Sequence, residues 1–457
     1  MTTPWLKAKV SRFLSDYGMV LVLALLCAFF SYVTWAEQHP AGAAAAELLT
    51  RDLLREAEAP NLHVLIVAGE SEQERAFADT LRDRLTAAGA TVLATVKGQP
   101  GDARRALKAI AASQESLDVI AADHAAAQWA VLGNVATNFP SLAQARIATA
   151  PSYWWPNFLK GDNLLNVANQ IVVIAILAIG MTMVIIAAGI DLSVGSLIAL
   201  SAVAAAVLVR DWGAETASPF AMILASLAGI SACAVLGMFS GLMITLFAIP
   251  PFIVTLAMML VGSGLAYILA KGQTIYQVPD TCTWLGRGIA AFGVPNAVVL
   301  MVLLYAAAHV LMSRMALGRY IYAVGGNPEA ARLSGVPVKR VLLFVYTLCG
   351  ALAGLGGIVT ASQLKSGSPT FGLMYELYAI AAVVVGGTSL SGGEGKILGT
   401  LIGALIIAVI QNGMNLTGVE SYTQKVVLGL VILGAVLLDR LKRRGWGLLR
   451  PRRRKEV

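Results

Sequence analysis

The sequence predicts a polytopic α-helical membrane protein of about ten spans, with a small α/β extracytoplasmic domain inserted after the first span. Three observations lead to this fold class. Of the 457 residues, 57% are hydrophobic and only 13% are charged, so most of the apolar surface must face lipid. The apolar residues form separate runs that are long enough to cross a bilayer. Residues 37–160, between the first two runs, are rich in Glu, Asp, Arg and Ala, as a soluble domain would be.

The first span is predicted within residues 1–36. Lys7, Lys9 and Arg12 precede the apolar run YGMVLVLALLCAFFSYVTW, an arrangement that is also typical of secretory signal peptides. No A-x-A cleavage pattern follows this run, and the run is long enough to span a bilayer. We therefore expect an uncleaved first helix with its basic end in the cytoplasm.

The inserted segment, residues 37–160, is predicted to alternate strands and helices. The order of the apolar and amphipathic stretches is β-α-β-α-β, which implies a small parallel sheet. The predicted strands are HVLIVAGE, TVLATVKG and LDVIAAD, and the predicted helices are SEQERAFADTLRDRLTAAG and GDARRALKAIAASQ. AGAAAAELL before them is predicted as a linker or tethering helix, and PSYWWPNFLKG after them carries the Trp and Tyr residues expected at a membrane interface.

Residues 161–440 contain the remaining apolar segments, which bring the total to about ten at ~20 residues each. YAIAAVVVGG is the shortest segment and ends in glycines. An even number of spans returns both termini to one side, and the cations support the cytoplasm for both. Residues 314–340 are basic, and the tail, residues 441–457, is more strongly basic. The tail could be a lipid-headgroup anchor or a stop signal.

Several other classes of site are not indicated by the composition. The net charge of +8 comes from cations at segment ends, so it does not predict nucleic-acid binding. The four cysteines show neither a disulfide pattern nor metal-ligand spacing. GEGKI at residues 393–397 is similar to a phosphate-binding loop, but Ile397 stands where Ser or Thr is required. We therefore expect no enzymatic activity, and we expect these glycines to allow close helix packing or a break in a helix.

The stretch GGNPEAARLSGVPVKR, residues 325–340, has the features of a short, sharply bounded helix. Asn327 can cap the helix, Pro328 suits its first position, and Glu329 complements its positive end. Gly335 can end it in a left-handed conformation. About two turns are too short to be stable alone in water. The helix must pack either on a cytoplasmic partner or on the protein's own span ends, and the residues alone leave both interpretations open.

Three segments also carry a family resemblance: LGRYIYAVGGNPEAARLSGVPVKR, GIDLSVGSLIALS and YAIAAVVVGGTSLSGGEGKILGTLIGALI. They resemble the signatures of permease subunits from ATP-binding-cassette (ABC) importers of the ribose and xylose type. The resemblance is loose over residues 17–35 and close over residues 161–440. It implies that residues 318–340 carry the coupling helix, which docks on the ATPase and transmits its closure. The positions that match the motif are Asn327, Glu329, Ala331, Arg332 and Gly335.

The resemblance further implies a set of partners in a bacterial cytoplasmic (inner) membrane. These partners are a separate cytoplasmic ABC ATPase that binds ATP and Mg²⁺, a second copy of the permease, an extracytoplasmic sugar-binding protein and the membrane lipid. No cofactor and no nucleic acid are expected on this chain. The implied solute is a monosaccharide, with a pentose favoured. Tyr378 departs from the family, since many relatives have Asp there, and this departure favours the xylose-like branch.

The large insert is the second departure, because the family usually joins its first two spans with a short segment. The insert resembles part of one lobe of a periplasmic sugar-binding protein, and on that interpretation it repositions or partly replaces the binding protein. An α/β domain without a ligand is the favoured alternative, because binding proteins enclose sugar between two lobes and only one fits here.

The predicted translocation pathway draws on the few polar residues within or beside the apolar segments. Asp191 in GIDLS needs a partner or a cavity; capping the next helix near Ser193 is favoured over direct contact with sugar. GIDLS and GTSLS, residues 387–391, are similar and could mark corresponding broken-helix elements. Asn412 and Asn415 can share one helical face, and hydrogen bonding between helices is at least an equal alternative for them. The candidates are Asp191, Ser193, Glu376, Ser389, Asn412 and Asn415.

Two functions of other classes remain as alternatives to the importer subunit. A stand-alone ion-coupled carrier would place more acidic or basic residues in its spans than this chain does. A membrane receptor with an external ligand-sensing domain would not need about ten spans.

Overall fold

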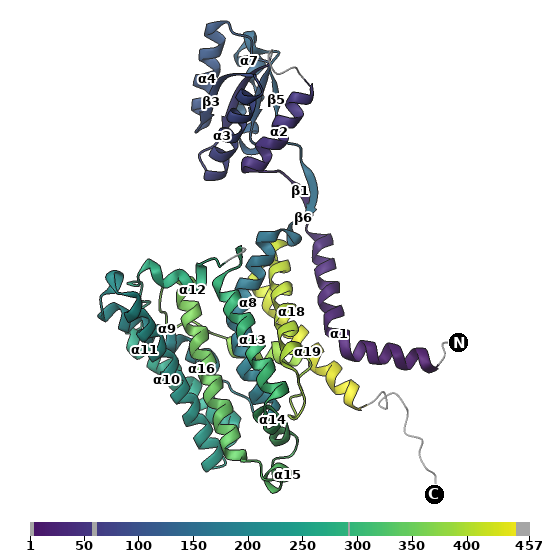
Figure 1. Ribbon diagram of the computed structural model, residues 1–457, viewed down its shortest axis with the longest axis vertical. Helices are drawn as coiled ribbons and strands as arrows, with labels where there is room; N and C mark the ends of the chain where they lie inside the picture. The colour runs from purple at the N-terminus through teal and green to yellow at the C-terminus, as the bar shows by residue number, and fades with distance from the viewer. Residues whose placement is uncertain (1–3, 57–61, 291–292, 445–457) are drawn as a thin grey trace. The chain divides into compact units, whose positions relative to one another are not determined.

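The computed structural model describes residues 4–56, 62–290 and 293–444. It divides into two compact units: unit 1 is Met1–Thr34 with Asn157–Val457, and unit 2 is Trp35–Pro156. The inserted segment therefore forms unit 2, and unit 1 is assembled from the chain on both sides of it (Figure 1).

Unit 2 is built on a four-stranded parallel sheet in the order β3-β2-β4-β5. Three of its strands occupy the segments predicted as strands, and β5 was not predicted. The strands are β2 (His63–Ala68), β3 (Thr91–Lys97), β4 (Val119–Ala122) and β5 (Arg146–Ala148). The main helices are α2 (Gly42–Glu56), α3 (Glu72–Ala87) and α4 (Pro100–Ser113), and short turns of helix follow β4: α5 (His124–Ala127), α6 (Ala130–Gly133), α7 (Val135–Asn138) and η2 (Pro140–Leu142).

Helices cover both faces of this sheet because the strand residues alternate between two hydrophobic cores. Val64 and Ile66 of β2 lie in the core that contains Phe77 of α3 and Leu49 of α2. Leu65 and Val67 lie in the other core, with Leu107 of α4 and residues of the short helices. AGAAAAELL is consequently part of a core helix, which removes the interpretation of this segment as a linker.

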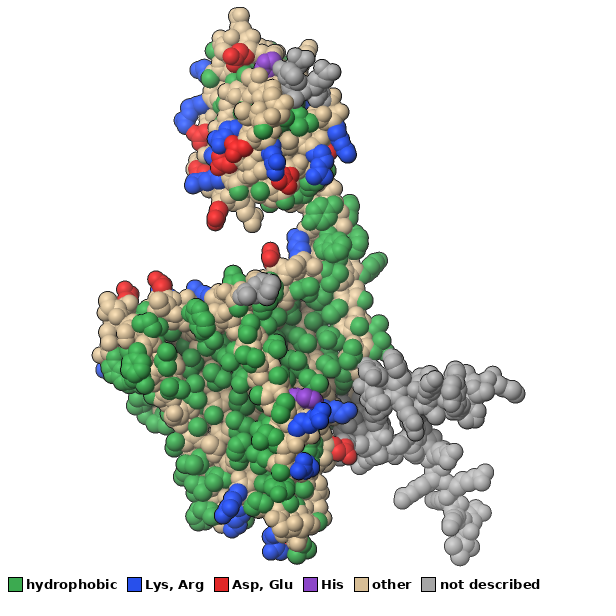
Figure 2. Space-filling model, viewed as in Figure 1, with side chains coloured by type: hydrophobic (Ala, Val, Ile, Leu, Met, Phe, Trp, Pro, Cys, Tyr) green, Lys and Arg blue, Asp and Glu red, His purple; other side chains and the backbone are tan. Residues whose placement is uncertain are grey.

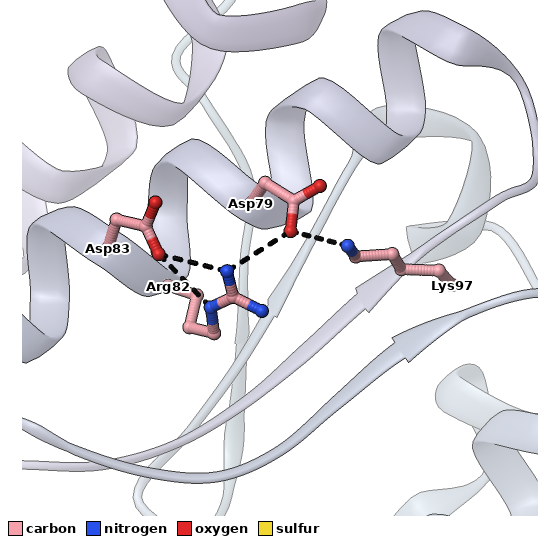
Figure 3. A network of polar contacts seen from close by, with 4 residues as sticks. All are labelled: Asp79, Arg82, Asp83 and Lys97. Atoms are coloured by element: carbon pink, nitrogen blue, oxygen red, sulfur yellow. Dashed lines mark hydrogen bonds and ion pairs between the residues drawn. The ribbon is translucent and has the colours of Figure 1, made fainter.

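Charged residues link α3 to the neighbouring edge strand β3 (Figure 3). Asp79 pairs with Lys97 of β3 and, at 3.3 Å, with Arg82, which also contacts Asp83 at 3.0 Å. The hydrogen bond from Lys97 is the main cause that holds the pKa of Asp79 below its ordinary value. Unit 2 also contains a two-stranded antiparallel ribbon of β1 (Trp35–Gln38) and β6 (Tyr153–Pro156), which carries the exposed Trp154 and Trp155.

Unit 1 is a helical bundle in which the long helices run between two opposite ends (Figure 1). We call these ends the α12 end and the α15 end after the short helices found there. The helices are α1 (Pro4–Val33), α8 (Gly161–Ile186), α9 (Val194–Asp211), α10 (Pro219–Leu246), α11 (Pro251–Ala270), α12 (Trp284–Arg287), α13 (Asn296–Arg314), α14 (Ala316–Gly326), α15 (Pro328–Leu333), α16 (Val338–Leu364), α17 (Tyr375–Val385), α18 (Ile397–Leu416) and α19 (Ser421–Arg444), with 3-10 turns η3 (Asn157–Leu159), η4 (Ala214–Thr216) and η5 (Asp280–Thr283).

Among the described residues, 7 helices are long and apolar enough to cross a membrane: α8, α9, α10, α11, α13, α16 and α18. The other three predicted spans are shorter apolar helices, Gly18–Val33, Tyr375–Val385 and Ser421–Gly434. On the face of unit 1 that Figure 2 shows, hydrophobic side chains cover most of the surface between the two ends, and many of the charged side chains lie toward those ends. The chain is thus a polytopic helical membrane protein. Most of the predicted basic tail lies outside the described residues.

Small residues allow the central helices to approach closely, as they do in other membrane bundles. A Cβ built on Gly350 of α16 would overlap the carbonyl oxygen of Cys233 of α10. A Cβ on Gly237 of α10 would likewise overlap the carbonyl oxygen of Tyr346 of α16. These two helices therefore pack backbone to backbone, and α8 packs on the same helix α16, where Gly180 lies against Cys349.

Candidate functional site

The predicted short helix is present as α15, and its ends are capped as the sequence indicates. The Asn327 side chain accepts a 2.9 Å hydrogen bond from the backbone N–H of Ala330, and Pro328 occupies the first turn. Gly335 has a φ of +82°. The N–H groups of Gly335 and Val336 donate to the carbonyl oxygens of Arg332 and Ala331, respectively, which closes the helix in the Schellman pattern. The backbone of α15 is thereby held rigid although the helix is only 6 residues long.

The side chains of α15 divide into one buried contact and an exposed surface. Ala331 is buried among residues of the main core of unit 1. Glu329 and Arg332 are exposed and form an ion pair at 3.0 Å, and Leu333 is 81% exposed. An exposed leucine beside a charged pair, on a rigid helix at one end of the bundle, is a surface that a protein partner could cover.

The helix that precedes α15 is joined tightly to two breaks between spans. A Cβ built on Gly325 of α14 would overlap the carbonyl oxygen of Ile186, the last residue of α8, and would lie 2.7 Å from the amide nitrogen of Gly393. The N–H of Gly393 donates to that same carbonyl oxygen at 2.8 Å. We call this contact of Ile186, Gly325 and Gly393 the glycine junction. It connects α14 to the α8–α9 break and to the loop between α17 and α18.

Tyr322 adds a side-chain contact to the same region. Its hydroxyl donates to the carbonyl oxygen of Gly395 at 2.7 Å. Burial raises the pKa of the Tyr322 hydroxyl, so the group stays a protonated donor. The loop between α17 and α18 is therefore fixed to α14 at two positions.

The two similar sequences, GIDLS and GTSLS, both lie at breaks between helices. GIDLS lies between α8 and α9, and GTSLS lies between α17 and α18. The breaks are in direct contact, because a Cβ on Gly392 would lie 2.7 Å from the Cβ of Ala188. The structure thus brings the two breaks together next to the glycine junction.

Asp191 and Ser193 are both buried in the α8–α9 break. Asp191 Oδ1 accepts hydrogen bonds from the Ser193 N–H at 2.9 Å and from the Ser193 hydroxyl at 2.6 Å. Asp191 therefore holds the residue that precedes α9 in an Asx turn. It does not bond the N–H groups of the first turn of that helix, as the predicted cap would. Its other oxygen, Oδ2, and the nearby hydroxyl of Tyr346 have no hydrogen-bond partner among the described residues. Two buried polar groups at this break are therefore not satisfied by hydrogen bonds.

Glu376 lies in the first turn of α17, and Ser389 lies in the loop between α17 and α18. A Cβ built on Gly195, in the first turn of α9, would overlap the Glu376 carboxylate. This carboxylate is therefore placed at the positive end of α9. Ser389 is buried, and its hydroxyl oxygen accepts a 3.2 Å hydrogen bond from the Ser391 N–H. The four candidates Asp191, Ser193, Glu376 and Ser389 thus surround the two breaks.

Asn412 and Asn415 are separate from this group. Asn412 exchanges two hydrogen bonds with Asn163 at the start of α8, at 2.9 and 3.0 Å. Asn415 instead accepts a 2.7 Å hydrogen bond from the side chain of Gln424 in α19. Both residues join helices, as the alternative interpretation expects. Asn163 was not predicted from the sequence. The glycine junction could not be predicted either, because Gly325 differs from other helical glycines only in the residues that lie near it in space.

The core of unit 1 matches known transport proteins. Residues 163–436 match a family model described as the permease component of the branched-chain amino acid transport system. The chain is 45% identical over 291 residues to the ribose import permease protein RbsC of Escherichia coli (strain K12), covering 63% of this chain and 88% of the relative. The ribose import permease protein RbsC of Bacillus subtilis (strain 168) is 46% identical over 289 residues, covering 63% and 87%.

A more distant relative is the D-allose transport system permease protein AlsC of Escherichia coli (strain K12). It is 35% identical over 285 residues, which are 62% of this chain and 85% of the relative. No solved structure matches the chain. Unit 2 lies outside the residues that the family model matches.

Proposed function

The chain belongs to the family of branched-chain amino acid transport system permease components, and we propose that it forms the translocation pathway of an ATP-driven importer of a neutral monosaccharide. The family match and the relatives named for ribose and D-allose import support this assignment. A pentose is the favoured solute, because the two ribose import permeases are 45% and 46% identical to this chain.

The proposed arrangement has ten spans in a bacterial inner membrane, with both termini and α15 in the cytoplasm. In this arrangement α1, α17 and α19 are the additional spans. Residues 365–374, between α16 and α17, are not helical. Non-helical backbone is tolerated within a membrane only where protein or a water-filled pathway surrounds it. Arg314, Arg319, Lys339 and Arg340 flank α15 in the sequence and favour a cytoplasmic location for that end. In this arrangement unit 2 is extracytoplasmic, the core of residues 161–440 is embedded in the membrane, and the tail is cytoplasmic.

The observation that carries the mechanism is the combination of a rigid, exposed α15 with the glycine junction beside it. We propose that α15 docks on a separate ATPase, which holds ATP and Mg²⁺, through the exposed residues Asn327, Glu329, Arg332 and Gly335. Ala331, the fifth residue of the motif, is buried in the core of unit 1 and would instead hold α15 on the bundle. The movement of the ATPase would pass from α15 through α14 to both breaks, because the backbones touch there without flexible side chains between them. Asp191, Ser193, Glu376 and Ser389 would line or position the pathway, whereas Asn412 and Asn415 would stabilise its wall.

Two further partners complete the proposal. A second copy of the permease would form the other half of the pathway, and an extracytoplasmic binding protein would deliver the sugar. Unit 2 carries the charged network of Asp79, Arg82, Asp83 and Lys97 on α3 and β3 (Figure 3). Such a network is compatible with our proposal that unit 2 lies in an aqueous compartment. Unit 2 has no assigned ligand, and its two cores are sufficient to explain it as a structural domain.

Removal of the exposed ion pair of α15 tests the coupling role. We expect the variant Glu329→Ala with Arg332→Ala to insert normally but to reduce ATP-dependent sugar uptake at least about fivefold, the lower range of typical coupling between sites. The matched control removes another exposed ion pair, Arg210→Ala with Asp211→Ala at the end of α9, and should leave uptake unchanged. Normal uptake by the α15 variant would show that its ion pair has no coupling role.

A further inference from the structure

Two buried polar atoms beside the α8–α9 break have no hydrogen-bond partner among the described residues: Oδ2 of Asp191 and the hydroxyl oxygen of Tyr346. The two side chains are 0% and 1% exposed, respectively, so bulk water does not supply the missing bonds. Buried polar groups in native proteins are nearly always bonded, because an unbonded group has lost its hydration without compensation. The protein therefore keeps this pair at a cost in stability.

The two atoms belong to elements that face each other. Tyr346 lies on α16, and a Cβ built on Gly189, two residues before Asp191, would lie 2.2 Å from the Tyr346 hydroxyl oxygen. Cys349 is three residues further along α16, on the same face of the helix, and its thiol interacts with the Asp191 carboxylate. A thiol is only a weak donor, so Asp191 Oδ2 still lacks a strong hydrogen bond.

The two atoms are chemically complementary. A tyrosine hydroxyl donates one hydrogen bond, and a carboxylate oxygen accepts one. Ser193 already bonds Oδ1 of Asp191, so Oδ2 is the oxygen that is left to accept. A hydrogen bond from Tyr346 to Oδ2 would satisfy both atoms at once, and a displacement of α16 relative to the break is sufficient to form it.

Both elements lie on the proposed route of movement from the ATPase. α16 begins at Val338, shortly after the end of α15, so a movement of α15 reaches Tyr346 along the chain. The break is reached through the glycine junction, which contains the carbonyl oxygen of Ile186 at the end of α8. Because Tyr346 and Asp191 lie on separate branches of this route, the distance between them can change during the cycle.

We infer that Tyr346 is a positioning residue for transport: its hydroxyl donates to Asp191 Oδ2 in a second conformation of the bundle, and this bond is absent in the conformation that the structure describes. A bond that exists in only one of two conformations shifts the equilibrium toward that conformation. The inference rests on the proposed function, because the transport cycle is what gives the α8–α9 break two conformations.

Removal of the hydroxyl group alone tests the inference. Tyr346→Phe should not lower the unfolding temperature of the purified chain, because the hydroxyl has no bond to lose in the described conformation. In proteoliposomes that contain the chain with its ATPase and binding protein, the same variant should reduce ATP-dependent ribose uptake roughly two- to tenfold, the change in population that one hydrogen bond produces.

Tyr305→Phe is the matched control, because it removes the same group from another buried tyrosine of the bundle. The Tyr305 hydroxyl donates to the carbonyl oxygen of Ala175 at 3.0 Å. This control variant should therefore have a lower unfolding temperature, and its uptake per folded protein should equal that of the unsubstituted chain.

A second experiment compares two states of the complex with its ATPase, one free of nucleotide and one trapped with ADP and vanadate. Tyr346→Phe should lower the unfolding temperature of the chain in one of these states only, whereas Tyr305→Phe should lower it in both. This readout separates a bond that forms during the cycle from a bond that is always present.

Loss of stability by Tyr346→Phe in every state would overturn the inference, since the hydroxyl would then already be bonded, for example by a buried water. Unchanged stability in both states of the complex, or normal uptake, would overturn it too. Failure of the unsubstituted complex to import any sugar would instead refute the proposed function. The stability of the purified Tyr346→Phe variant would still decide whether the hydroxyl is unbonded in the described conformation.

Discussion

Asp191 is a buried carboxylate with a structural role that the hydrogen bonds show and a transport role that we propose. Its Oδ1 holds the N–H and the hydroxyl of Ser193 and thereby fixes the chain as it enters α9. Its Oδ2 has no hydrogen-bond partner among the described residues, but the side chain is completely buried, so contact with solute would require the α8–α9 break to open. Substitutions that keep or remove Oδ1 separate the two roles.

We predict that Asp191→Ala lowers the free energy of unfolding by about 1–3 kcal/mol, because Ser193 loses its acceptor. Asp191→Asn keeps an oxygen acceptor and should cost less. Thermal unfolding of the purified variants in detergent measures the difference. Equal stability of the Ala variant and the unsubstituted chain would contradict the structural role, and loss of uptake with normal stability in the Asn variant would assign Asp191 to solute contact.

Asp79 permits a prediction about pH, because its folded-state pKa is lowered mainly by the hydrogen bond from Lys97. A lowered pKa stabilises the fold above the unfolded-state pKa, and this stabilisation is lost as the pH falls through the lower folded-state pKa. Asp79→Asn should therefore reduce the stability of unit 2 at pH 7 by about 1 kcal/mol or less, since the pair is exposed.

Urea unfolding of a fragment spanning residues 35–156, followed at pH 7 and at pH 3, measures this effect. The difference in stability between the unsubstituted fragment and its Asp79→Asn variant should narrow at pH 3. A difference that is as large at pH 3 as at pH 7 would show that the ion pair is not its cause.

At the scale of elements, α15 could be predicted closely from local signals. Asn327, Pro328 and Gly335 cap the helix through contacts with residues close to them in the sequence. Their pattern can therefore be recognised without knowledge of the tertiary structure. The partner of Asn412 could not be predicted, since Asn163 lies 249 residues away in the sequence. β5 was missed for a related reason: its 3 residues become a strand only because β4 offers an edge.

The glycine junction yields the sharpest prediction at this scale. Gly325→Ala would place a methyl group against the carbonyl oxygen of Ile186, whereas a Cβ on the adjacent Gly326 has nothing within 4 Å. We therefore expect Gly325→Ala to reduce ATP-dependent uptake at least about fivefold, and Gly326→Ala to have little effect. Both variants add the same methyl group to the same helix.

Uptake per inserted protein, measured with ATP hydrolysis by the complex, tests this pair of variants. Hydrolysis that continues while uptake falls would locate the defect in coupling. Equal uptake by the two variants would argue that the contact at Gly325 carries no movement.

At the scale of the whole molecule, composition alone predicts the membrane bundle, because 57% hydrophobic residues cannot be enclosed in one soluble core. The number of spans is less readable. α17 has only 11 residues, and the chain before it is largely non-helical, so neither length nor periodicity identifies it as a span. Whether α17 can serve as a span depends on the helices that pack around it.

Unit 2 has two hydrophobic cores of its own, so we predict that residues 35–156 fold without unit 1. The purified fragment should give a single cooperative thermal transition by circular dichroism. A fragment that shows helix content but no cooperative transition would contradict the prediction.

The central claim is that a separate ATPase drives this chain through α15. Uptake of radiolabelled ribose into proteoliposomes tests it most directly, with the binding protein present and with the ATPase, ATP or both omitted in turn. We predict accumulation of ribose against a gradient only when the ATPase and ATP are present together. Accumulation by the chain without the ATPase, driven by an ion gradient, would contradict it.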